Sequence, residues 1–353
     1  MRLYKNPAWY RLSPELDRAQ IEARLQELVT RSLKALAEVN LITLEGDEVR
    51  PLEGARLMAR HYMAFDTMKI FATTKGDEDL SELLKVVCGS KELSDISLRR
   101  NEKTVLNALN KDKAKETIRF PFEGKVMDNV TKVSILAQAQ LGCLNIDDAK
   151  CPGLSREAAR ILQLGQRLSR CLSDLLWSSP DADKKHKAVK NSAILAKCFS
   201  SGVWNNTEFV SKQIERVGIV LSSHLKGSGY TSFAKLAAAN PRELEMCVNK
   251  QPPFGNHLRK SAIHMPEYAL DLEQIFQQAA GAKPNVARVR VTVTLVNADA
   301  LRDCSSAGDR HTCSLVVANL KNEILFRAKI KDSTLILSTE NRFEIGLRLT
   351  IVI

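Results

Sequence analysis

The 353-residue sequence predicts an α+β fold that is mainly α-helical. Over most of the chain, apolar residues recur at the three- and four-residue spacing of amphipathic helices. Beyond Lys283-Pro284 the period changes to two, which is typical of β-strands with one buried face. Apolar residues make up 44% and charged residues 26% of the chain, close to globular averages, so a disordered chain is not favoured.

Residues 1–75 predict a partial winged helix. Residues 14–39 have the apolar pattern of a helix, whose start is marked by Ser13 and Pro14. Strand-like runs at 41–44 and 49–51 around the turn at 45–47 predict a short hairpin. After Gly54 we expect a second amphipathic helix that carries on one side Leu57, His61, Tyr62, Phe65 and Met68. An ordinary packing unit with no nucleic-acid role is an equal alternative.

Residues 76–212 predict a helical bundle. Helical patterns cover 80–88, 97–110, 129–144 and 155–177. The charged segments 111–116 and 178–191 are rich in turn-forming residues and are predicted to be solvated connections.

The helix predicted from Leu154 to Trp177 carries a row of five long polar side chains, which we call the polar ladder. Its members follow one another at steps of four, three, four and three, so they share one helical face: Arg156, Arg160, Gln163, Arg167 and Arg170. At about 1.5 Å per residue the row extends about 20 Å, enough to meet several phosphates of one strand. Arginine binds phosphate oxygens and also stacks on bases. A solvated face paired with neighbouring carboxylates is the alternative.

Residues 213–283 predict a degenerate helix-hairpin-helix unit. Such units bind phosphate through backbone N–H groups at a glycine turn before a helix, with basic side chains nearby. The turn here carries Gly255, followed by His257, Arg259 and Lys260, whereas the earlier turn at Gly218 lacks the usual second glycine. A packing role is the alternative.

Residues 284–353 predict an incomplete immunoglobulin-like β-sandwich. Strand patterns occur at 289–295, 311–320, 323–330, 333–338 and 342–353. These are about five strands where such a sandwich usually has about seven, so we expect the chain to stop inside this domain.

The residues that could act in catalysis or ligand binding predict a binding region without an active site, a cofactor or a metal. The excess of 52 basic over 41 acidic side chains, a net charge of +11, favours a polyanionic partner. The Gly124-Lys125 step lacks the first glycine and the hydroxyl residue of a phosphate loop. The six histidines and eight cysteines are scattered, without the spacing of a zinc site or a catalytic pair. The sequence also has no long apolar run, so neither secretion nor membrane insertion is expected.

The order of these parts resembles the C-terminal accessory region of superfamily-two helicases. The stretches RLYKNPAWYRL (2–12), PLEGARLMARHYMAFDTMKIF (51–71) and ELSDISLRRNEKTVLNALN (92–110) most resemble the meiotic, crossover-promoting Mer-type DNA helicase family. The resemblance implies a nuclear, ATP-dependent 3′-to-5′ DNA helicase that acts in meiotic recombination. ATP and Mg would belong to motor domains that are missing from this chain. The implied partners are single-stranded or branched DNA, those motor domains and recombination proteins.

The resemblance also implies roles for particular residues. In such helicases the long bundle helix touches the translocated single strand, so the polar ladder would take that role. Gly255, His257, Arg259 and Lys260 would be secondary contacts, and Arg31 and Lys34 of the winged helix would be weaker ones. Two other functions stay open: a protein-interaction scaffold, and the accessory region of a spliceosomal-type RNA helicase.

Overall fold

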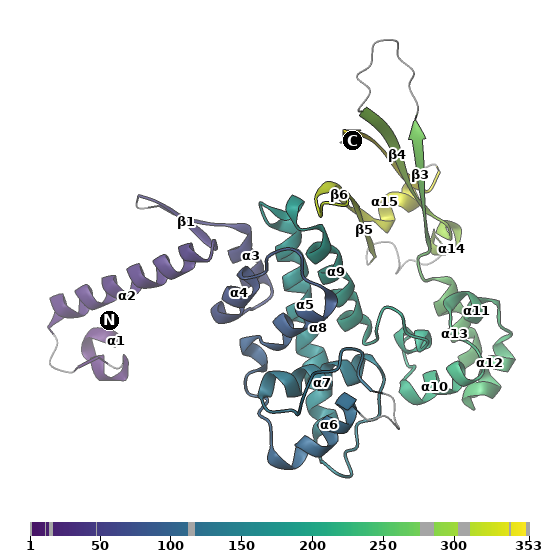
Figure 1. Cartoon of the computed structure of the whole chain (residues 1–353), viewed down its shortest axis with the longest axis horizontal. Helices are drawn as coiled ribbons and strands as arrows, with labels where there is room; N and C mark the ends of the chain where they lie inside the picture. The colour runs from purple at the N-terminus through teal and green to yellow at the C-terminus, as the bar shows by residue number, and fades with distance from the viewer. Residues whose placement is uncertain are drawn as a thin grey trace. The chain divides into compact units, whose positions relative to one another are not determined.

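The computed structural model describes residues 2–10, 12–13, 17–46, 48–111, 117–275, 286–302, 311–338 and 340–350. Over these residues the chain is mainly helical with small antiparallel sheets, which confirms the predicted α+β, mainly α class (Figure 1). It folds as two compact units. Unit 1 holds residues 1–140 and 144–200, and unit 2 holds residues 141–143 and 201–353. The finer division into four domains stays a prediction.

Unit 1 begins with a long helix and a short hairpin, as predicted. Asp17 starts the helix because its carboxylate accepts the Gln20 N–H at 2.7 Å, while the Gln20 side chain accepts the Asp17 N–H at 3.0 Å. The predicted start at Pro14 and the turn residue Asp47 lie outside the described residues. The elements are α1 (Arg2–Lys5), η1 (Pro7–Tyr10), α2 (Arg18–Glu38), β1 (Ile42–Glu45) and β2 (Glu48–Pro51).

The second amphipathic helix predicted after Gly54 is wrong as a single element. The chain forms two helices, α3 (Glu53–Arg60) and α4 (Phe65–Ala72). The break follows from a tertiary contact, because the Glu92 carboxylate accepts the Ala64 N–H at 2.8 Å and caps the start of α4. Tyr62 lies in the turn between the helices and is exposed, so it is not on the buried side with Leu57.

The bundle surrounds one central helix. Every residue from Lys132 to Ala139 of α7 is buried, which explains the weak amphipathic pattern of that segment. The prediction of a solvated loop over 178–191 is wrong from His186 onward, because α9 begins there and buries Ala188 and Val189. In the other predicted loop, residues 112–116 lie outside the described residues. The bundle elements are α5 (Leu80–Cys88), η2 (Lys91–Leu93), η3 (Arg100–Glu102), α6 (Lys103–Lys111), α7 (Asn129–Leu141), α8 (Leu154–Ser178), η4 (Ala182–Lys184) and α9 (His186–Ser201).

Unit 2 starts with short helices around a core of their own. This core includes Leu225, Leu236, Leu244 and Leu258, each fully buried. The elements are η5 (Val210–Gln213), α10 (Ile219–Gly227), α11 (Phe233–Ala238), α12 (Pro241–Val248) and α13 (Phe254–Ile263).

The β-rich part of unit 2 begins earlier than predicted. β3 (Tyr268–Ile275) pairs antiparallel with β4 (Val286–Leu295), and β4 pairs with β7 (Arg342–Thr350). The predicted boundary at 283/284 lies outside the described residues, as do residues 351–353 of the predicted last strand. β5 (Thr312–Ala318) and β6 (Ile324–Lys331) form a separate hairpin.

One predicted strand of this region is wrong. Of residues 333–338, residues 333–337 belong to a short helix, α15 (Asp332–Leu337), that follows β6 and buries Leu335 in the core between the sheets. A second short helix, α14 (Ala298–Arg302), follows β4. The strand-like composition of 333–338 is therefore overridden by tertiary packing.

The described ranges contain seven cysteines and helices of both units. The seven cysteines there are free thiols, and Cys304 lies outside these ranges. In the same part of the chain, no helix has both the length and the apolar character to cross a membrane.

Candidate nucleic-acid interface

Helix α8 is held in place by a buried apolar stripe and by a close approach to α9. The stripe includes Leu154, Ile161, Leu168 and Leu172, all nearly free of solvent contact. A Cβ atom built on Gly165 would lie 2.2 Å from the Phe199 ring, so glycine is needed for the two helices to pack at this distance. The opposite side of α8 is consequently turned outward.

The polar ladder lies on this outward side of α8. Arg156, Arg160, Gln163 and Arg170 are exposed, and Arg167 is partly buried. The Nε atom of Arg167 is buried and has no hydrogen-bond partner among the described residues. A buried donor without a partner is costly, and because this Nε atom is closed to solvent, a phosphate can contact Arg167 only through the other guanidinium nitrogens.

One ladder residue has a carboxylate partner. Arg160 Nη2 lies 2.7 Å from Asp95 Oδ2, and the two side chains are 53% and 56% exposed. Exposed ion pairs of this kind contribute about 0–1 kcal/mol, so an incoming phosphate can compete for Arg160. Within the described ranges, Arg156, Arg167 and Arg170 form no ion pair.

The carboxylate nearest in sequence to Arg156 is occupied by other cations. Glu157 contacts Arg99 Nη2 at 2.6 Å through one oxygen and Lys132 Nζ at 2.6 Å through the other. Lys132 also donates to Glu102 at 2.7 Å and to the Ser97 carbonyl at 2.9 Å. Lys132 and Glu102 are 0% and 2% exposed, so this is a buried ion cluster that fixes the first turn of α8.

The far end of the ladder meets the turn after α3. His61 Nε2 lies 3.5 Å from Asp174 Oδ2, one helical turn beyond Arg170. Burial lowers the pKa of His61, Asp174 opposes this shift, and the positive charges of Arg170 and Arg60 add to it.

The buried cluster and the partner of Arg160 were not found from the sequence. Lys132 is the one charged residue of α7 and lies between Thr131 and Val133, and a single lysine in an uncharged helix of the core is the signal that indicates a buried pair. Asp95 lies 65 residues from Arg160 and carries no local signal.

The predicted hairpin contacts of unit 2 have protein partners instead. The Gly255 N–H donates to Glu245 Oε1 at 3.0 Å, and a Cβ at Gly255 would lie 1.9 Å from the Pro241 carbonyl oxygen. His257 Nε2 donates to the Glu215 carbonyl at 2.9 Å, and Arg259 Nε donates to the Ala237 carbonyl at 2.9 Å. Of the four predicted contacts, Arg259 and Lys260 are exposed.

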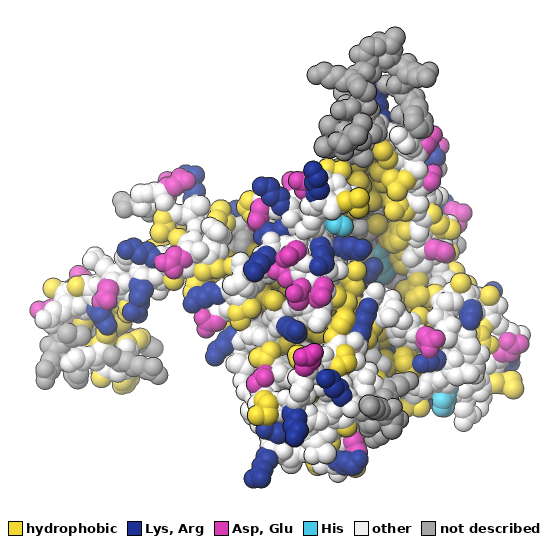
Figure 2. Space-filling view, in the orientation of Figure 1, with side chains coloured by type: hydrophobic (Ala, Val, Ile, Leu, Met, Phe, Trp, Pro, Cys, Tyr) yellow, Lys and Arg dark blue, Asp and Glu magenta, His cyan; other side chains and the backbone are white. Residues whose placement is uncertain are grey.

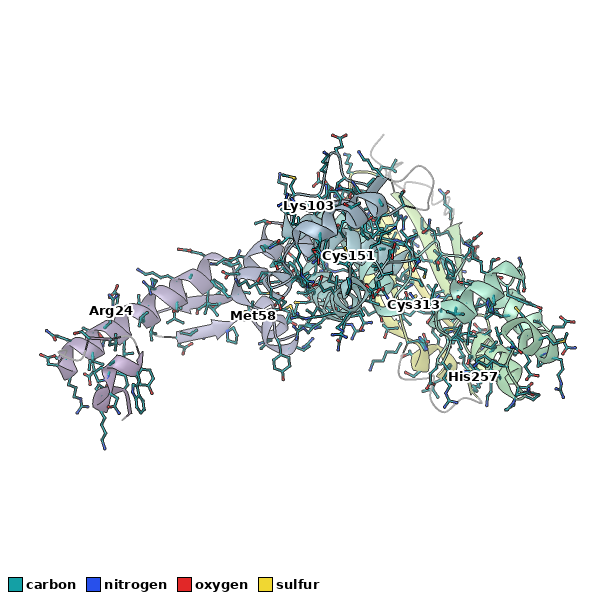
Figure 3. All side chains as sticks on the ribbon, turned by 90° about the horizontal axis from the view of Figure 1, so that it is seen from below. Arg24, Met58, Lys103, Cys151, His257 and Cys313 are labelled. Atoms are coloured by element: carbon teal, nitrogen blue, oxygen red, sulfur yellow. The ribbon has the colours of Figure 1, made fainter. Side chains whose placement is uncertain are left out.

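The structure thus gives Gly255 a packing role, because its N–H already has an acceptor. A phosphate at this turn would have to displace Glu245, which is 5% exposed. Figure 3 labels His257 on α13 among the helices of unit 2.

Arg31 and Lys34 lie on α2, apart from the polar ladder. Both are exposed on a shallow depression of α2 that also contains Glu27 and Glu38. Within unit 1, Figure 3 shows Arg24 of α2 well separated from Met58 of α3, and α2 contacts the hairpin at β1. The structure therefore does not bring these two residues into one site with the ladder.

Charge of one sign does not dominate the visible face of unit 1. Figure 2 shows Lys and Arg side chains interspersed with Asp and Glu over its helices.

Among the described residues, no group of three His, Cys, Asp or Glu side chains could hold a metal ion. The candidate interface is therefore the row of residues on α8.

Comparisons with known proteins show which family and which helicases the chain is similar to. Residues 51–352 match the family model described as the Sec63 Brl domain. The chain is 41% identical over 336 residues to the probable ATP-dependent DNA helicase HFM1 of Xenopus tropicalis, covering 95% of this chain and 24% of that protein. It is 41% identical over 337 residues to the human protein of the same name, covering 95% and 23%. It is 29% identical over 343 residues to the ATP-dependent DNA helicase homolog MER3 of Arabidopsis thaliana, covering 94% and 29%. The chain spans about a quarter of the length of these relatives.

Proposed function

The chain belongs to the family of Sec63 Brl domains, and on this premise we propose that it is a non-catalytic DNA-binding accessory region of an ATP-dependent 3′-5′ DNA helicase. In this role the polar ladder holds the backbone of an unpaired strand while motor domains outside this chain move it. The names of the relatives, which are ATP-dependent DNA helicases, support DNA as the ligand. Action in the nucleus, in meiotic recombination and crossover formation, is part of the same proposal.

The observation that carries the proposal is the unpaired charge on α8. Four arginines share one face, and three of them have no carboxylate partner in the described parts of the chain. The nearby acidic side chains are engaged elsewhere, Glu157 by Lys132 and Arg99, and Asp174 by His61. If this face were only solvated and its charge were balanced within the chain, neighbouring carboxylates would form ion pairs with these guanidinium groups.

The test is a salt titration of binding to a fluorescent single-stranded DNA, followed by anisotropy. For a single strand, the slope of log K against log salt is about −0.7 for each phosphate contact. Four arginine contacts therefore predict a slope of about −2.8, and the triple variant Arg156→Gln, Arg167→Gln, Arg170→Gln should retain about −0.7. The matched control removes the same charge from exposed lysines on other elements, Lys5→Gln, Lys125→Gln and Lys321→Gln, and should keep the slope.

Three results would contradict the proposal. Equal effects of the ladder and control variants would show that only net charge matters. Tighter binding to an RNA of the same sequence would favour the accessory region of an RNA helicase. Absence of single-strand binding at low salt would favour the protein-interaction scaffold.

A further inference from the structure

An exposed aromatic side chain lies in the turn after α3, next in sequence to the residue that contacts α8. Tyr62 is 82% exposed, the largest fraction of any exposed tyrosine, tryptophan or phenylalanine in the described ranges. Its neighbours in sequence point inward, since Met63 is 5% exposed and the His61 side chain is 11% exposed. The ring therefore stands out from a well-packed turn.

This turn is fixed against α8. His61 contacts Asp174 of α8 at 3.5 Å, and Arg170 and Arg60 are both close enough to lower the pKa of His61 by their charge. Tyr62 thus follows directly on a residue that touches α8 and that is close to two exposed arginines of unit 1, Arg170 and Arg60. An aromatic face combined with cations that track a backbone is the arrangement by which proteins hold single strands.

The backbone of Tyr62 has a conformation that tyrosine rarely adopts. Its φ angle is +51°, in the left-handed region, at the position after a helix where glycine is usual. The Tyr62 N–H donates to the Ala59 carbonyl at 3.3 Å, and the Met63 N–H donates to the Met58 carbonyl at 2.9 Å. These bonds hold the turn, so a side chain that is unfavourable for the backbone is kept in a defined outward position.

We propose that Tyr62 is a stacking platform for one unpaired base of a strand whose phosphates lie on the polar ladder. This inference rests on the proposed function and adds a residue outside α8 to the interface. Because stacking on an aromatic ring tolerates every base, the contact strengthens binding without reading sequence. The ladder would supply the salt-dependent part of the affinity, and Tyr62 a part that does not depend on salt.

The experiment uses the whole chain and a single-stranded DNA of about 12 nucleotides with one 2-aminopurine, which loses fluorescence when it stacks on an aromatic ring. Across a set of oligonucleotides with the probe at successive positions, one position should be quenched on binding. Tyr62→Ala should abolish this quenching, weaken binding about five-fold or more and leave the salt slope unchanged. Tyr62→Phe should keep both quenching and affinity. Trp9→Ala removes another exposed aromatic, 76% exposed, and should have no effect.

Tyr62→Gly separates binding from folding. Glycine suits the left-handed backbone, so this variant should melt no lower than the wild-type chain while it binds as weakly as Tyr62→Ala. If Tyr62→Ala and Tyr62→Gly bind within two-fold of wild type while the ladder variant loses its salt slope, the stacking role is wrong and the proposed function stands. If the wild-type chain binds no single strand at all, both are wrong.

Discussion

The buried ion cluster beneath the first turn of α8 leads to a quantitative prediction for Lys132→Met. Methionine keeps most of the apolar stem and removes the ammonium group, which makes three polar contacts at 2.6–2.9 Å. Glu102 would then keep a carboxylate that is 2% exposed and has lost its closest cation. Removing one partner of a buried pair costs about 3–5 kcal/mol, a large fraction of a total stability of about 5–15 kcal/mol.

The contribution of Glu157 to this loss should be small. Its side chain is 20% exposed and keeps Arg99 at 2.6 Å after the substitution. We therefore expect urea unfolding, followed by far-ultraviolet circular dichroism, to give a free energy of unfolding for Lys132→Met that is about 3–5 kcal/mol below wild type.

A second variant tests the reason for the loss. Adding Glu102→Gln to Lys132→Met removes the buried charge that has lost Lys132 and keeps only Arg99, at 3.4 Å, so it should recover about half of the lost stability or more, because replacing a whole buried pair is often nearly neutral. A loss below about 1 kcal/mol for Lys132→Met, or a double variant less stable than the single one, would refute the assignment of this cluster as a buried pair that holds α8.

Three further outcomes follow from the same structure. Asp95→Asn frees Arg160 from its ion pair and should tighten single-strand binding while the salt slope stays at about −2.8, because Arg160 is already one of the four contacts; an unchanged affinity would mean that Arg160 touches no phosphate. Gly255→Ala places a Cβ atom 1.9 Å from the Pro241 carbonyl oxygen and should lower the melting temperature, with a cost of about 3 kcal/mol. A fully stable Gly255→Ala chain would argue against the close approach of α12 and α13. Burial lowers the pKa of His61 below 6.5, so the unfolded chain binds a proton at this residue more readily than the folded chain does. The contribution of His61 to the free energy of unfolding is therefore fully present above pH 6.5 and falls as the pH drops below it. His61→Asn should flatten this fall between about pH 8 and pH 5; an identical profile for both chains would exclude His61 as its source.

Elements with a strong local period could be predicted from the sequence. The polar ladder is an example, because the steps between Arg156 and Arg170 define a face for any α-helix, whatever packs around it. The strand at 289–295 is another, since Val291 and Val293 alternate with polar residues and are buried as expected.

Elements that depend on distant contacts could not be predicted in this way. Glu92 breaks the helix after α3 by capping Ala64, which is 28 residues away and has no cap of its own. The apolar residues of 333–338 fit a strand equally well until packing around Leu335 makes them a helix. The strand β3 did carry a signal, because Tyr268, Leu270 and Leu272 alternate with other residues, but its pairing with β4 is not local.

The exposed ion pair of α8 and the buried pair beneath its first turn differ in how far mobile ions in the buffer can reach them. Arg160 and Asp95 are more than half exposed, whereas Lys132 and Glu102 are sealed inside the bundle at 0% and 2%. Added potassium chloride screens the first pair and hardly reaches the second. The salt concentration can therefore be raised until the nucleic acid dissociates, while α8 keeps its orientation in the bundle. The low-salt and high-salt parts of a binding titration then report on the same folded surface.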